Sequence, residues 1–429
     1  MAHIIPIAGI RYKTRTPGSD ITPLISPPYD VLSPSDKQTL LERDSHNIVA
    51  IDLPQCPAKQ AGPDAVYQRS AQWLQEWLNE GVLVRDNEPA LYVYHQAYTI
   101  KGRHYLRRKF FAALRLEPFG QGRVFPHEHT FGGPKEDRLK LMQATRCNLS
   151  AVFGLFSDPT GQVMERLDPA SAAPVAVADM NGVKNYLWRM TDPHVIEGVR
   201  EAIIDEPIYI ADGHHRYGTA LTYRDWLAGR HGGKLPADHP ANFVLTGFCA
   251  MEDPGLIILP THRILENASL DLAALADASK GAFHLVHGRT GDPELLANEV
   301  AQLADGSVGI LTPGEKAGSL LILDKPDVLD AMTPDRSQAF RRLAVSVLHH
   351  YLIDKLIAGA LGRAPAIAYT ADPVEAVRMA RDKTGVALIT QPTRMAQMRD
   401  VCLANDLMPQ KSTFFYPKLA TGMVINPLE

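Results

Sequence analysis

The sequence of 429 residues predicts an α/β or α+β fold with a mixed sheet at its core. Short apolar runs rich in β-branched and aromatic residues alternate with segments of helical spacing, and two of the runs are close enough to form a hairpin. With 45% hydrophobic and 21% charged residues the composition is that of a globular protein. The length is sufficient for two or three domains, each with a core of its own.

Strands are predicted where apolar runs end in turn residues, at residues 4–10, 48–53, 90–98, 107–116, 151–156, 175–178, 208–210, 243–251 and 256–259. Lys101-Gly102 is the expected hairpin turn between the third and fourth of these. Helical spacing predicts helices at residues 60–80 and 137–143, directly after Asp212, and through Val345, Leu348 and Leu352.

Changes in composition divide the chain into three parts. Residues 1–264 are the predicted main domain. Residues 265–340 are rich in Ala, Leu and Asp with several Gly/Pro turns, and are predicted to form a smaller α/β domain or insertion. Residues 341–429 begin with a helix and end in the loop MPQKSTFFYPKLATG, which we expect to return to the functional site.

Charge and cysteine usage limit the classes of function. The net charge of −4 argues against a general nucleic-acid binder. The four cysteines form no CxxC pair, which favours thiols in a reducing cytoplasm. The N-terminus MAHIIPIAGIRY does not resemble a signal peptide, and we find no apolar stretch of 18 residues. We therefore expect a cytoplasmic protein that binds a small molecule rather than nucleic acid or membrane, and a homodimer remains open.

The segment IYIADGHHRYGTALTYRDWL carries the strongest functional signal. A buried strand is expected to end at a turn that opens a helix, where free N–H groups and the helix dipole favour an anion. We predict Asp212 as a catalytic residue, and as binders of phosphate or substrate Gly213, His214, His215 and Arg216. An N-cap aspartate followed by two surface histidines would be the simpler explanation.

Two earlier motifs add further candidates. In PPYDV, the prolines stiffen a turn that presents Asp30, either as a catalytic carboxylate or as a helix cap. In PHEHTFGGPKEDR, Glu128 is a candidate base, and Lys135 and Arg138 are candidate phosphate binders. A solvated charged loop would also explain this segment. Arg146, beyond the following helix, extends the same polar stripe.

Two later motifs complete the predicted site. ILPTHR delivers His262 and Arg263 at the end of an apolar run, a usual position for functional groups in α/β folds. KSTFFYP contributes Lys411, Ser412 and Thr413, although the glycines of a P-loop are absent and core packing would explain its aromatic residues.

Together these motifs resemble a known family. PPYDV, PHE-x-T followed by KEDR, ATR-x-N, DGHHRY-x-TA, LPTHR and KSTFFYPK occur in the order seen in the bacterial family called domain of unknown function 1015, from about residue 4 to residue 426. His129 stands where the family more often has Arg, and Gly218 where it often has Glu. The family has no settled activity, so this resemblance implies a grouping and no reaction.

A shorter resemblance concerns the strand, the DGHHR turn and the helix that follows. They look like the phosphate-binding turn of the ParB/sulfiredoxin superfamily, which includes nucleotide-hydrolysing partition proteins and a free-serine kinase. The resemblance implies that residues 213–216 hold nucleotide phosphates and that Asp212 lies near the reacting hydroxyl. It covers about twenty residues, and superfamily membership does not fix a reaction.

The leading hypothesis is phosphoryl transfer from ATP or ADP, assisted by Mg²⁺, to a small hydroxylated metabolite, for example a free amino acid such as serine. This chemistry needs positive charge around the phosphoryl oxygens and an acceptor for the hydroxyl proton. A second hypothesis is metal-assisted hydrolysis, with Glu128 as base and metal ligands from His127, His129, His214 and His262. A third is a non-catalytic protein that senses nucleotides or binds a partner. We expect no resident metal site of the zinc type.

Overall fold

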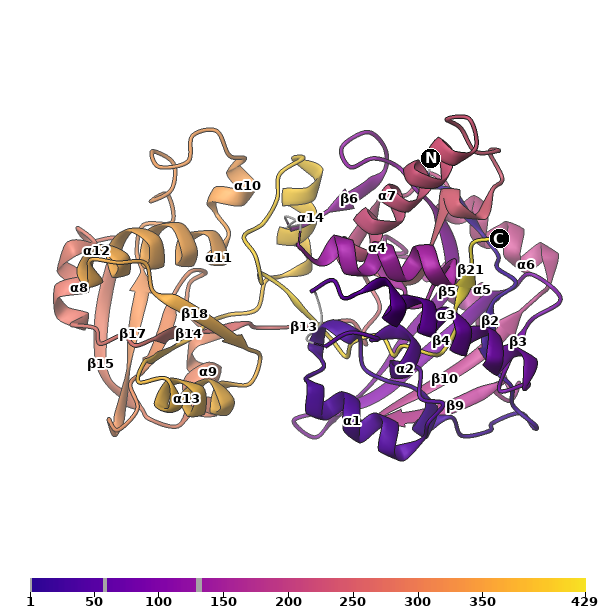
Figure 1. The fold of residues 1–429 in the computed structure, drawn as a ribbon. Coiled ribbons are helices and arrows are strands. Elements are labelled where there is room, and N and C mark those ends of the chain that lie inside the picture. Colours follow the sequence, from indigo (N-terminus) through magenta and orange to yellow (C-terminus); the bar gives the residue numbers. More distant parts are fainter. Residues whose placement is uncertain (1, 57–59, 129–132) are drawn as a thin grey trace. The chain divides into compact units, whose positions relative to one another are not determined.

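The computed structural model describes residues 2–56, 60–128 and 133–429, and the side chains of all of these except residues 133–135. The chain divides into two compact units (Figure 1). Unit 1 comprises Met1–Pro126, Thr130–Ile257 and Pro417–Glu429, and unit 2 comprises His127–His129 and Ile258–Tyr416.

Unit 1 contains a nine-stranded sheet within the described residues. Its strands, in spatial order, are β6 (Val124–Pro126), β11 (Ile208–Asp212), β8 (Val152–Phe156), β12 (Phe243–Ala250), β5 (Arg103–Arg115), β4 (Leu91–Ile100), β10 (Val183–Met190) and β9 (Ala176–Met180), with β1 (Ile4–Ile5) also beside β5. The pairs β6–β11 and β8–β12 are parallel and the others antiparallel. The predicted mixed sheet is confirmed, as is the β4–β5 hairpin across Lys101-Gly102.

The remaining elements of unit 1 surround this sheet. Its helices are α1 (Pro34–Arg43), α2 (Val49–Asp52), α3 (Asp64–Asn79), α4 (Gly133–Thr145), α5 (Gln162–Arg166), α6 (Pro193–Ile203) and α7 (His214–Arg230). Short 3₁₀ turns are η1 (Thr22–Leu24), η2 (Tyr29–Val31) and η3 (Pro240–Asn242). Two small pairs are β2 (Ile10–Tyr12) with β3 (Leu83–Arg85), and β7 (Cys147–Asn148) with β21 (Asn426–Pro427).

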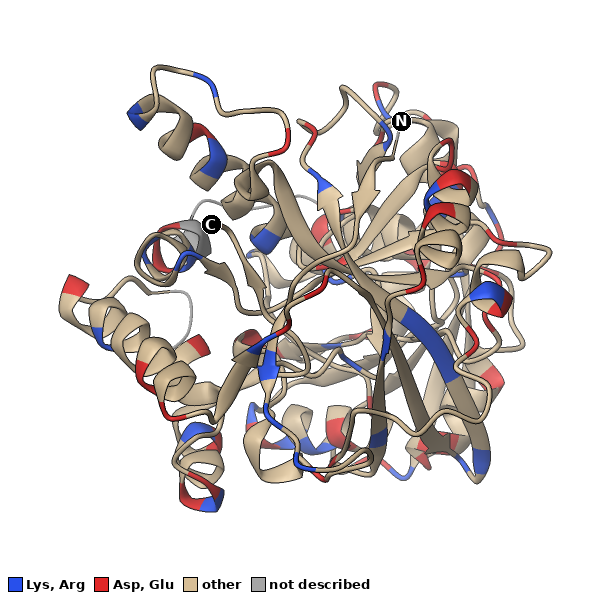
Figure 2. Cartoon of the chain, turned by 90° about the vertical axis from the view of Figure 1, so that its right-hand side faces the viewer, with Lys and Arg blue, Asp and Glu red and all other residues tan. Residues whose placement is uncertain are grey.

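The two faces of this sheet differ in chemistry. On one face, Phe110, Ile210 and Phe248 pack with residues of α5, α6 and α7 in an apolar core. On the opposite face, β5 carries the buried cations Arg107 and Lys109 among aromatic rings. Figure 2 shows several basic residues on the strands, while many of the other charges lie on helices and loops.

Unit 2 is built on an antiparallel sheet covered on both faces. The strand order is β15 (Phe283–Thr290), β17 (Ala317–Leu323), β16 (Val308–Leu311), β19 (Val386–Ile389), β14 (His262–Glu266) and β18 (Ala366–Thr370). Its helical segments are α8 (Leu272–Ala278), α9 (Pro293–Val300), α10 (Gln338–Arg341), α11 (Ala344–Ser346), the π-helical η4 (Val347–Ile357), α12 (Ala358–Leu361), α13 (Pro373–Asp382) and α14 (Met395–Leu403). The strands β13 (Ile257–Leu259) and β20 (Phe414–Tyr416) form a separate pair.

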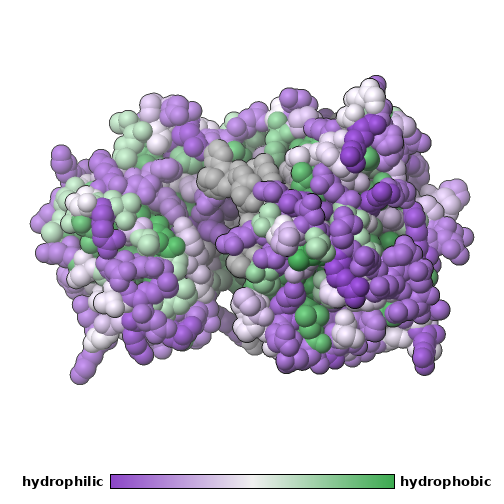
Figure 3. Space-filling view, in the orientation of Figure 1, coloured by the Kyte–Doolittle hydropathy of each residue, from purple (hydrophilic) through white to green (hydrophobic). Residues whose placement is uncertain are grey.

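Two apolar clusters fill the two faces of the unit 2 sheet. One joins the sheet to α8 and η4, and the other joins it to α9 and α13, so that unit 2 has three layers (Figure 1). The fold class predicted from the sequence, α/β with a mixed sheet, is therefore confirmed. Hydrophilic residues make up most of the surface of each unit in the view of Figure 3.

Three local predictions are wrong. Residues 48–53 form the helical turn α2 instead of a strand, because the side chain of Asn47 accepts a hydrogen bond from Val49 N and donates to the carbonyls of Pro23 and Ile25. Residues 4–10 form no single strand, since Pro6 lacks an N–H and β1 and β2 belong to different sheets. His262 and Arg263 do not end a strand but are the first two residues of β14.

The expectation that no apolar stretch reaches 18 residues is also wrong. The continuous helix Ala344–Leu361 has a mean hydropathy of 1.2 and is long enough to cross a membrane by length and composition. Half of that window is buried, and Leu348, Leu352 and Ile357 belong to the core of unit 2. Packing against the sheet therefore accounts for its apolar residues.

Candidate functional site

The turn after β11 has the predicted strand, turn and helix. Asp212 ends the strand opposite Phe153 of β8, after a bulge, and α7 begins at His214. Gly213 is the N-cap residue with φ of 86°, a left-handed conformation that favours glycine. Among the described residues no side chain caps α7. Of the described backbone N–H groups at this turn, Asp212 accepts the adjacent one of Gly213, at 2.8 Å, and it therefore does not act as a cap of the helix.

Asp212 is held ionised by two cations. Lys418 donates to its Oδ2 at 3.0 Å, and a guanidinium nitrogen of Arg216 lies 3.6 Å from its Oδ1. Burial by itself would raise the pKa of Asp212, but the ammonium of Lys418 and the guanidinium of Arg216 hold it well below its usual range. The carboxylate is 22% exposed and can therefore meet a ligand while remaining charged.

Arg216 is folded back over the turn. A Cβ placed on Gly213 would lie 2.9 Å from Arg216 Nε, so only glycine leaves room for the guanidinium. Arg216 also donates to the carbonyl of Ala151. Burial lowers the pKa of Arg216, but the carboxylates of Asp212 and Asp30 outweigh this and raise it. Asp30 itself is exposed on η2.

A second charged cluster lies next to Arg216 in unit 1. Arg138 stacks on the buried ring of Tyr29 at 4.0 Å and pairs with Asp137 at 2.7 Å. It also donates to the carbonyl of Asp52 at 2.6 Å. Burial raises the pKa of Asp52, although Arg138 and the Ser150 hydroxyl, at 2.8 Å, act in the opposite direction. The predicted Arg138 is thus part of a buried network.

A small cavity of about 30 Å³ connects the two clusters. It is lined by residues that include Tyr29, Asp52, Arg138, Arg216 and Thr219. This volume is enough for a water-sized molecule that could bridge buried polar groups. The cavity places Arg216 and Arg138 on one common internal surface of unit 1.

In unit 2, Glu128 and the KST segment form one cluster. Glu128 Oε1 accepts the N–H of Ser412 at 3.0 Å and lies 3.5 Å from His127 Nε2. His127 Nε2 is also 2.8 Å from the hydroxyl of Thr413. Lys411 is exposed, with φ of 56°. His127 and Glu128 of the PHEHT motif therefore contact the KST segment, where Glu128 already has partners.

His262 and Arg263 are buried at the start of β14. His262 Nδ1 accepts the N–H of Thr390 at 3.1 Å, while burial and the adjacent Arg263 lower its pKa to about 4. Arg263 donates to the carbonyls of Thr261 and Lys411 and meets His349 Nε2 at 3.2 Å. Burial lowers the pKa of Arg263 to about 10. These contacts bind the KST segment to the sheet of unit 2.

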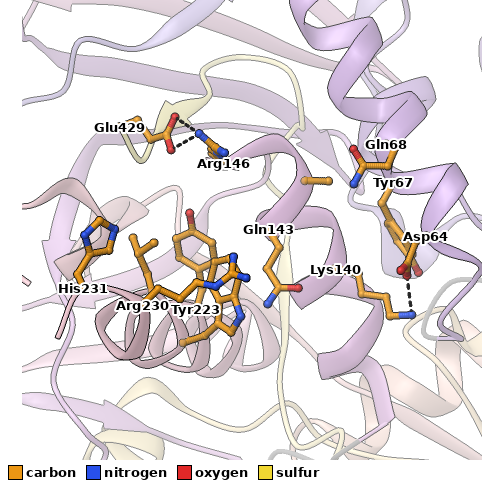
Figure 4. A pocket seen from close by; sticks show the side chains of 13 residues that line it. Asp64, Tyr67, Gln68, Lys140, Gln143, Arg146, Tyr223, Arg230, His231 and Glu429 are labelled. Atoms are coloured by element: carbon orange, nitrogen blue, oxygen red, sulfur yellow. Dashed lines mark hydrogen bonds and ion pairs between the residues drawn. The ribbon is translucent and has the colours of Figure 1, made fainter. Parts of the chain in front are cut away.

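Arg146 lies in a different environment from the one we predicted. It donates to both carboxylate oxygens of Glu429, at 2.7 and 2.9 Å, in a pocket of about 650 Å³ (Figure 4). The pocket is lined by residues of α3, α4 and α7, among them Lys140 and Tyr223. Lys135 lies in α4, but its side chain is outside the described residues, as is His129.

The residues of the predicted site belong to both units. Asp30, Arg138, Asp212, His215 and Arg216 belong to unit 1, whereas Glu128 and His262 belong to unit 2. His214 and His215 are half-buried on the first turn of α7. In the part of the chain that the structure describes, no three His, Cys, Asp or Glu side chains come together as a metal site.

Sequence reasoning gave too little weight to three residues. Lys418 was noted only as the lysine after the KSTFFYP loop, yet it pairs with Asp212. Asp52 lay in a presumed strand, yet it contacts Arg138. Lys109 lay in the strand predicted at residues 107–116 and was not singled out, yet its exposure is 0%. Only the alternation of basic and aromatic residues in β5 could have drawn attention to Lys109.

Solved structures with some similarity share little sequence with this chain. A truncated SbnI from Staphylococcus aureus is 10% identical with a TM-score of 0.36, covering 74% of this chain and 87% of its own. A mutant free serine kinase in complex with ADP is 9% identical, with a TM-score of 0.34 and coverages of 68% and 84%. A conserved hypothetical protein from Pyrococcus furiosus is 10% identical, with a TM-score of 0.31 and coverages of 69% and 89%.

These TM-scores are low, and we base no functional argument on them. No curated protein matches the chain. The model of the family described as "Protein of unknown function (DUF1015)" matches residues 4–346, which is most of the chain. This confirms the family that the motifs predicted, although the predicted match extended to about residue 426. The chain belongs to the DUF1015 family.

Proposed function

We propose that this protein is a phosphotransferase that uses ATP or ADP to phosphorylate the hydroxyl of a small metabolite, a free amino acid such as serine being one candidate. The observation that carries the proposal is Asp212, a carboxylate held ionised beside Arg216 at the uncapped N-terminus of α7. Phosphoryl transfer needs an acceptor for the hydroxyl proton next to positive groups that stabilise the phosphoryl oxygens.

In this proposal the nucleotide phosphates meet the first N–H groups of α7 and the guanidinium of Arg216. The substrate hydroxyl loses its proton to Asp212 as its oxygen bonds to phosphorus, and the bond from phosphorus to the nucleotide oxygen breaks. Lys418 and Arg216 keep Asp212 ionised before each turnover. Arg138 lines the same small cavity as Arg216.

Magnesium would enter with the nucleotide. Mg²⁺ is usually bound by substrate phosphates, waters and one or two carboxylates. Asp212 and the exposed Asp30 are carboxylates whose charges act on Arg216. The four cysteines are free thiols, which fits the expectation of a reducing cytoplasm. We expect the acceptor to be a free small molecule.

A thermal-shift titration with ADP and ATP in the presence of Mg²⁺ tests this proposal. The expected stabilisation is about 2.7 kcal/mol when the ligand is at a hundred times its dissociation constant. Arg216→Ala should abolish the shift. Arg230→Ala, at the far end of α7 where the arginine stacks on Trp226, is the matched control and should retain it. If wild-type protein shows no shift with either nucleotide, the proposal is wrong.

A further inference from the structure

Lys109 of β5 is fully buried, and no carboxylate of the described residues pairs with it. Its Nζ donates to Gln96 Oε1 and lies 4.2 Å from the ring of Tyr94 and 5.9 Å from that of Phe153. Among the described residues it forms no ion pair, and Asp253, a carboxylate whose charge acts on it, pairs with Arg108. A lysine has three N–H donors, and an amide oxygen and ring faces satisfy them weakly.

The neighbourhood of Lys109 increases its need for an anion. Arg107, two residues earlier on the same strand face, is also fully buried and donates to the same Gln96 Oε1 at 2.5 Å. Burial and the positive charge of Arg107 hold the pKa of Lys109 well below its usual range, so the charged form of Lys109 is costly here and a bound anion would favour it. Two adjacent cations inside a protein are costly unless negative charge compensates them.

Lys109 lies on the same face of the sheet as Asp212. Residues directly paired across neighbouring strands share a face. Asp212 pairs with Phe153, Phe153 with Gly247, and Gly247 with Phe111 of β5, two residues from Lys109. The ring of Phe153, directly opposite Asp212, is also near Nζ of Lys109. The two groups are therefore the two ends of one oblique row across the face, which spans three strand intervals and two residues along β5.

The segment Pro417–Ala420 covers this row. The carbonyl of Pro417 accepts from Arg107, and the carbonyl of Lys418 accepts from Gln96 Nε2 at 3.1 Å. The N–H of Ala420 donates to the hydroxyl of Tyr94 at 3.3 Å, and the side chain of Lys418 reaches Asp212. The segment thus presents neutral carbonyls to the cation pair and a lysine to the proposed base.

We propose that Lys109, assisted by Arg107, is an anion subsite that receives the carboxylate or phosphate of the phosphoryl acceptor when Pro417–Ala420 moves aside. This proposal rests on the proposed function. An anion would give Lys109 the negative partner that it lacks among the described residues. Displacing Lys418 from Asp212 in the same movement would open the base to the acceptor hydroxyl. Binding of the acceptor and exposure of Asp212 would then be coupled.

The strand order also restricts the acceptor. From β11 to β5 there are three inter-strand steps of about 4.8 Å each, and the side chains of Asp212 and Lys109 cover only part of that distance. A molecule that reaches both must carry its anionic group several bonds away from its hydroxyl. A longer hydroxy acid or a phosphorylated alcohol therefore fits this row better than a three-carbon amino acid such as serine.

The test uses inorganic phosphate as the probe in thermal-shift titrations of the full-length protein, with ionic strength held constant by NaCl. Wild-type protein should be stabilised, and Lys109→Met should lose most of that shift while melting no lower than wild type without ligand, because a buried charge is removed. Lys184→Met, an exposed lysine on β10 of the same sheet, is the matched control and should behave as wild type. Phosphate bound at α7 would raise the melting temperature of all three proteins equally. A smaller phosphate shift in Lys109→Met than in wild type therefore reports binding at Lys109.

Equal phosphate shifts in wild type and Lys109→Met, or no shift in wild type, would overturn the subsite. Lys109→Gln is measured in parallel, so that a folding defect in one variant leaves the test intact.

In a second arm, 6-hydroxyhexanoate should stabilise wild type in a Lys109-dependent way and L-serine should not; a Lys109-dependent shift with L-serine would overturn the length requirement. The ADP shift should survive in Lys109→Met. If ADP does not shift the melting temperature of wild-type protein, the proposed phosphotransferase is refuted. The phosphate comparison would still show whether Lys109 binds an anion.

Discussion

Lys418 donates a hydrogen bond of 3.0 Å to Asp212, although 206 positions separate the two residues in the sequence. The side chains are 23% and 22% exposed, so the pair is partly shielded from water. Lys418 belongs to the segment that covers the cations of β5, and Asp212 ends the strand that opens into α7. This one contact connects the end of the chain to the turn that the sequence marks most strongly.

Removing Lys418 should destabilise the protein in a pH-dependent way. Lys418→Met is expected to cost about 1–3 kcal/mol near pH 7, the usual range for a hydrogen bond to a charged group. Because Lys418 depresses the pKa of Asp212, its contribution is complete above about pH 4, the ordinary value for Asp, and is lost as the pH falls below it. Denaturant unfolding between pH 3 and 8 measures this, with Lys234→Met as an exposed control. A difference that stays constant down to pH 3 would contradict the assignment.

Asp212→Asn should separate binding from turnover. The amide keeps the size of the side chain but cannot accept the hydroxyl proton, so turnover should fall on the order of a hundredfold or more while nucleotide affinity changes only a few fold. The measurement is nucleotide-dependent phosphorylation of a panel of hydroxylated metabolites. Asp225→Asn, an exposed position on the same helix, should retain activity. Unchanged turnover in Asp212→Asn would pass the role of base to Asp30 or Glu128.

Gly213→Ala should impair the turn while a second glycine substitution in α7 does not. At Gly213, an added methyl group meets Arg216 Nε at 2.9 Å and the backbone has φ of 86°, so we expect a loss of about 1–3 kcal/mol and a weaker nucleotide shift. Gly229 has open space around its Cβ position, so Gly229→Ala should be neutral or stabilise by about 0.5–1 kcal/mol. Thermal melts with and without ADP make the comparison. Equal effects at both positions would show that the turn has no special geometry.

Unit 2 should loosen below neutral pH. Burial, reinforced by Arg263 and only partly opposed by Asp372, lowers the pKa of His262 from 6.5 to about 4. The folded state therefore binds its proton less readily than the unfolded state, and stability is lost as the pH falls from about 6.5 toward 4. The buried His349, with its pKa lowered to about 3, adds to this slope.

Hydrogen exchange of peptides from β14 and β19 at pH 7.5 and pH 5, corrected for intrinsic rates, measures this loosening. His262→Asn can accept the N–H of Thr390 without titrating, so it should reduce the pH effect. His231→Asn, an exposed histidine, should leave it unchanged. Protection that does not depend on pH in wild type would refute the prediction.

Elemental analysis distinguishes phosphoryl transfer from the hydrolase hypothesis. Within the described residues, His127 and His262 have protein partners, and no three potential ligands gather. We therefore expect untagged protein to contain less than stoichiometric zinc, and chelator treatment to leave the melting temperature unchanged. Stoichiometric zinc that chelators remove with a loss of stability would favour metal-assisted hydrolysis instead.

Local signals were sufficient where neighbouring residues determine the structure. The β4–β5 hairpin and the turn from β11 into α7 were predicted because alternating apolar residues, a glycine and the start of a helical pattern follow one another directly. The sequence also marked Asp212 and Arg216 as neighbours, since they are four positions apart, about one helical turn. It failed at residues 48–53, where every side chain of α2 is buried and periodicity carries no information.

Charge compensation was decided by the tertiary structure alone. Nothing in the sequence near Asp212 indicates Lys418, and nothing near Arg138 indicates Asp52, because an ion pair depends on distance in space and not along the chain. Lys109 and Arg107 occupy alternate positions that would face water in an amphipathic strand. In the structure Pro417–Ala420 returns over that face and both side chains are buried, which makes two ordinary strand cations a candidate binding site for an anion.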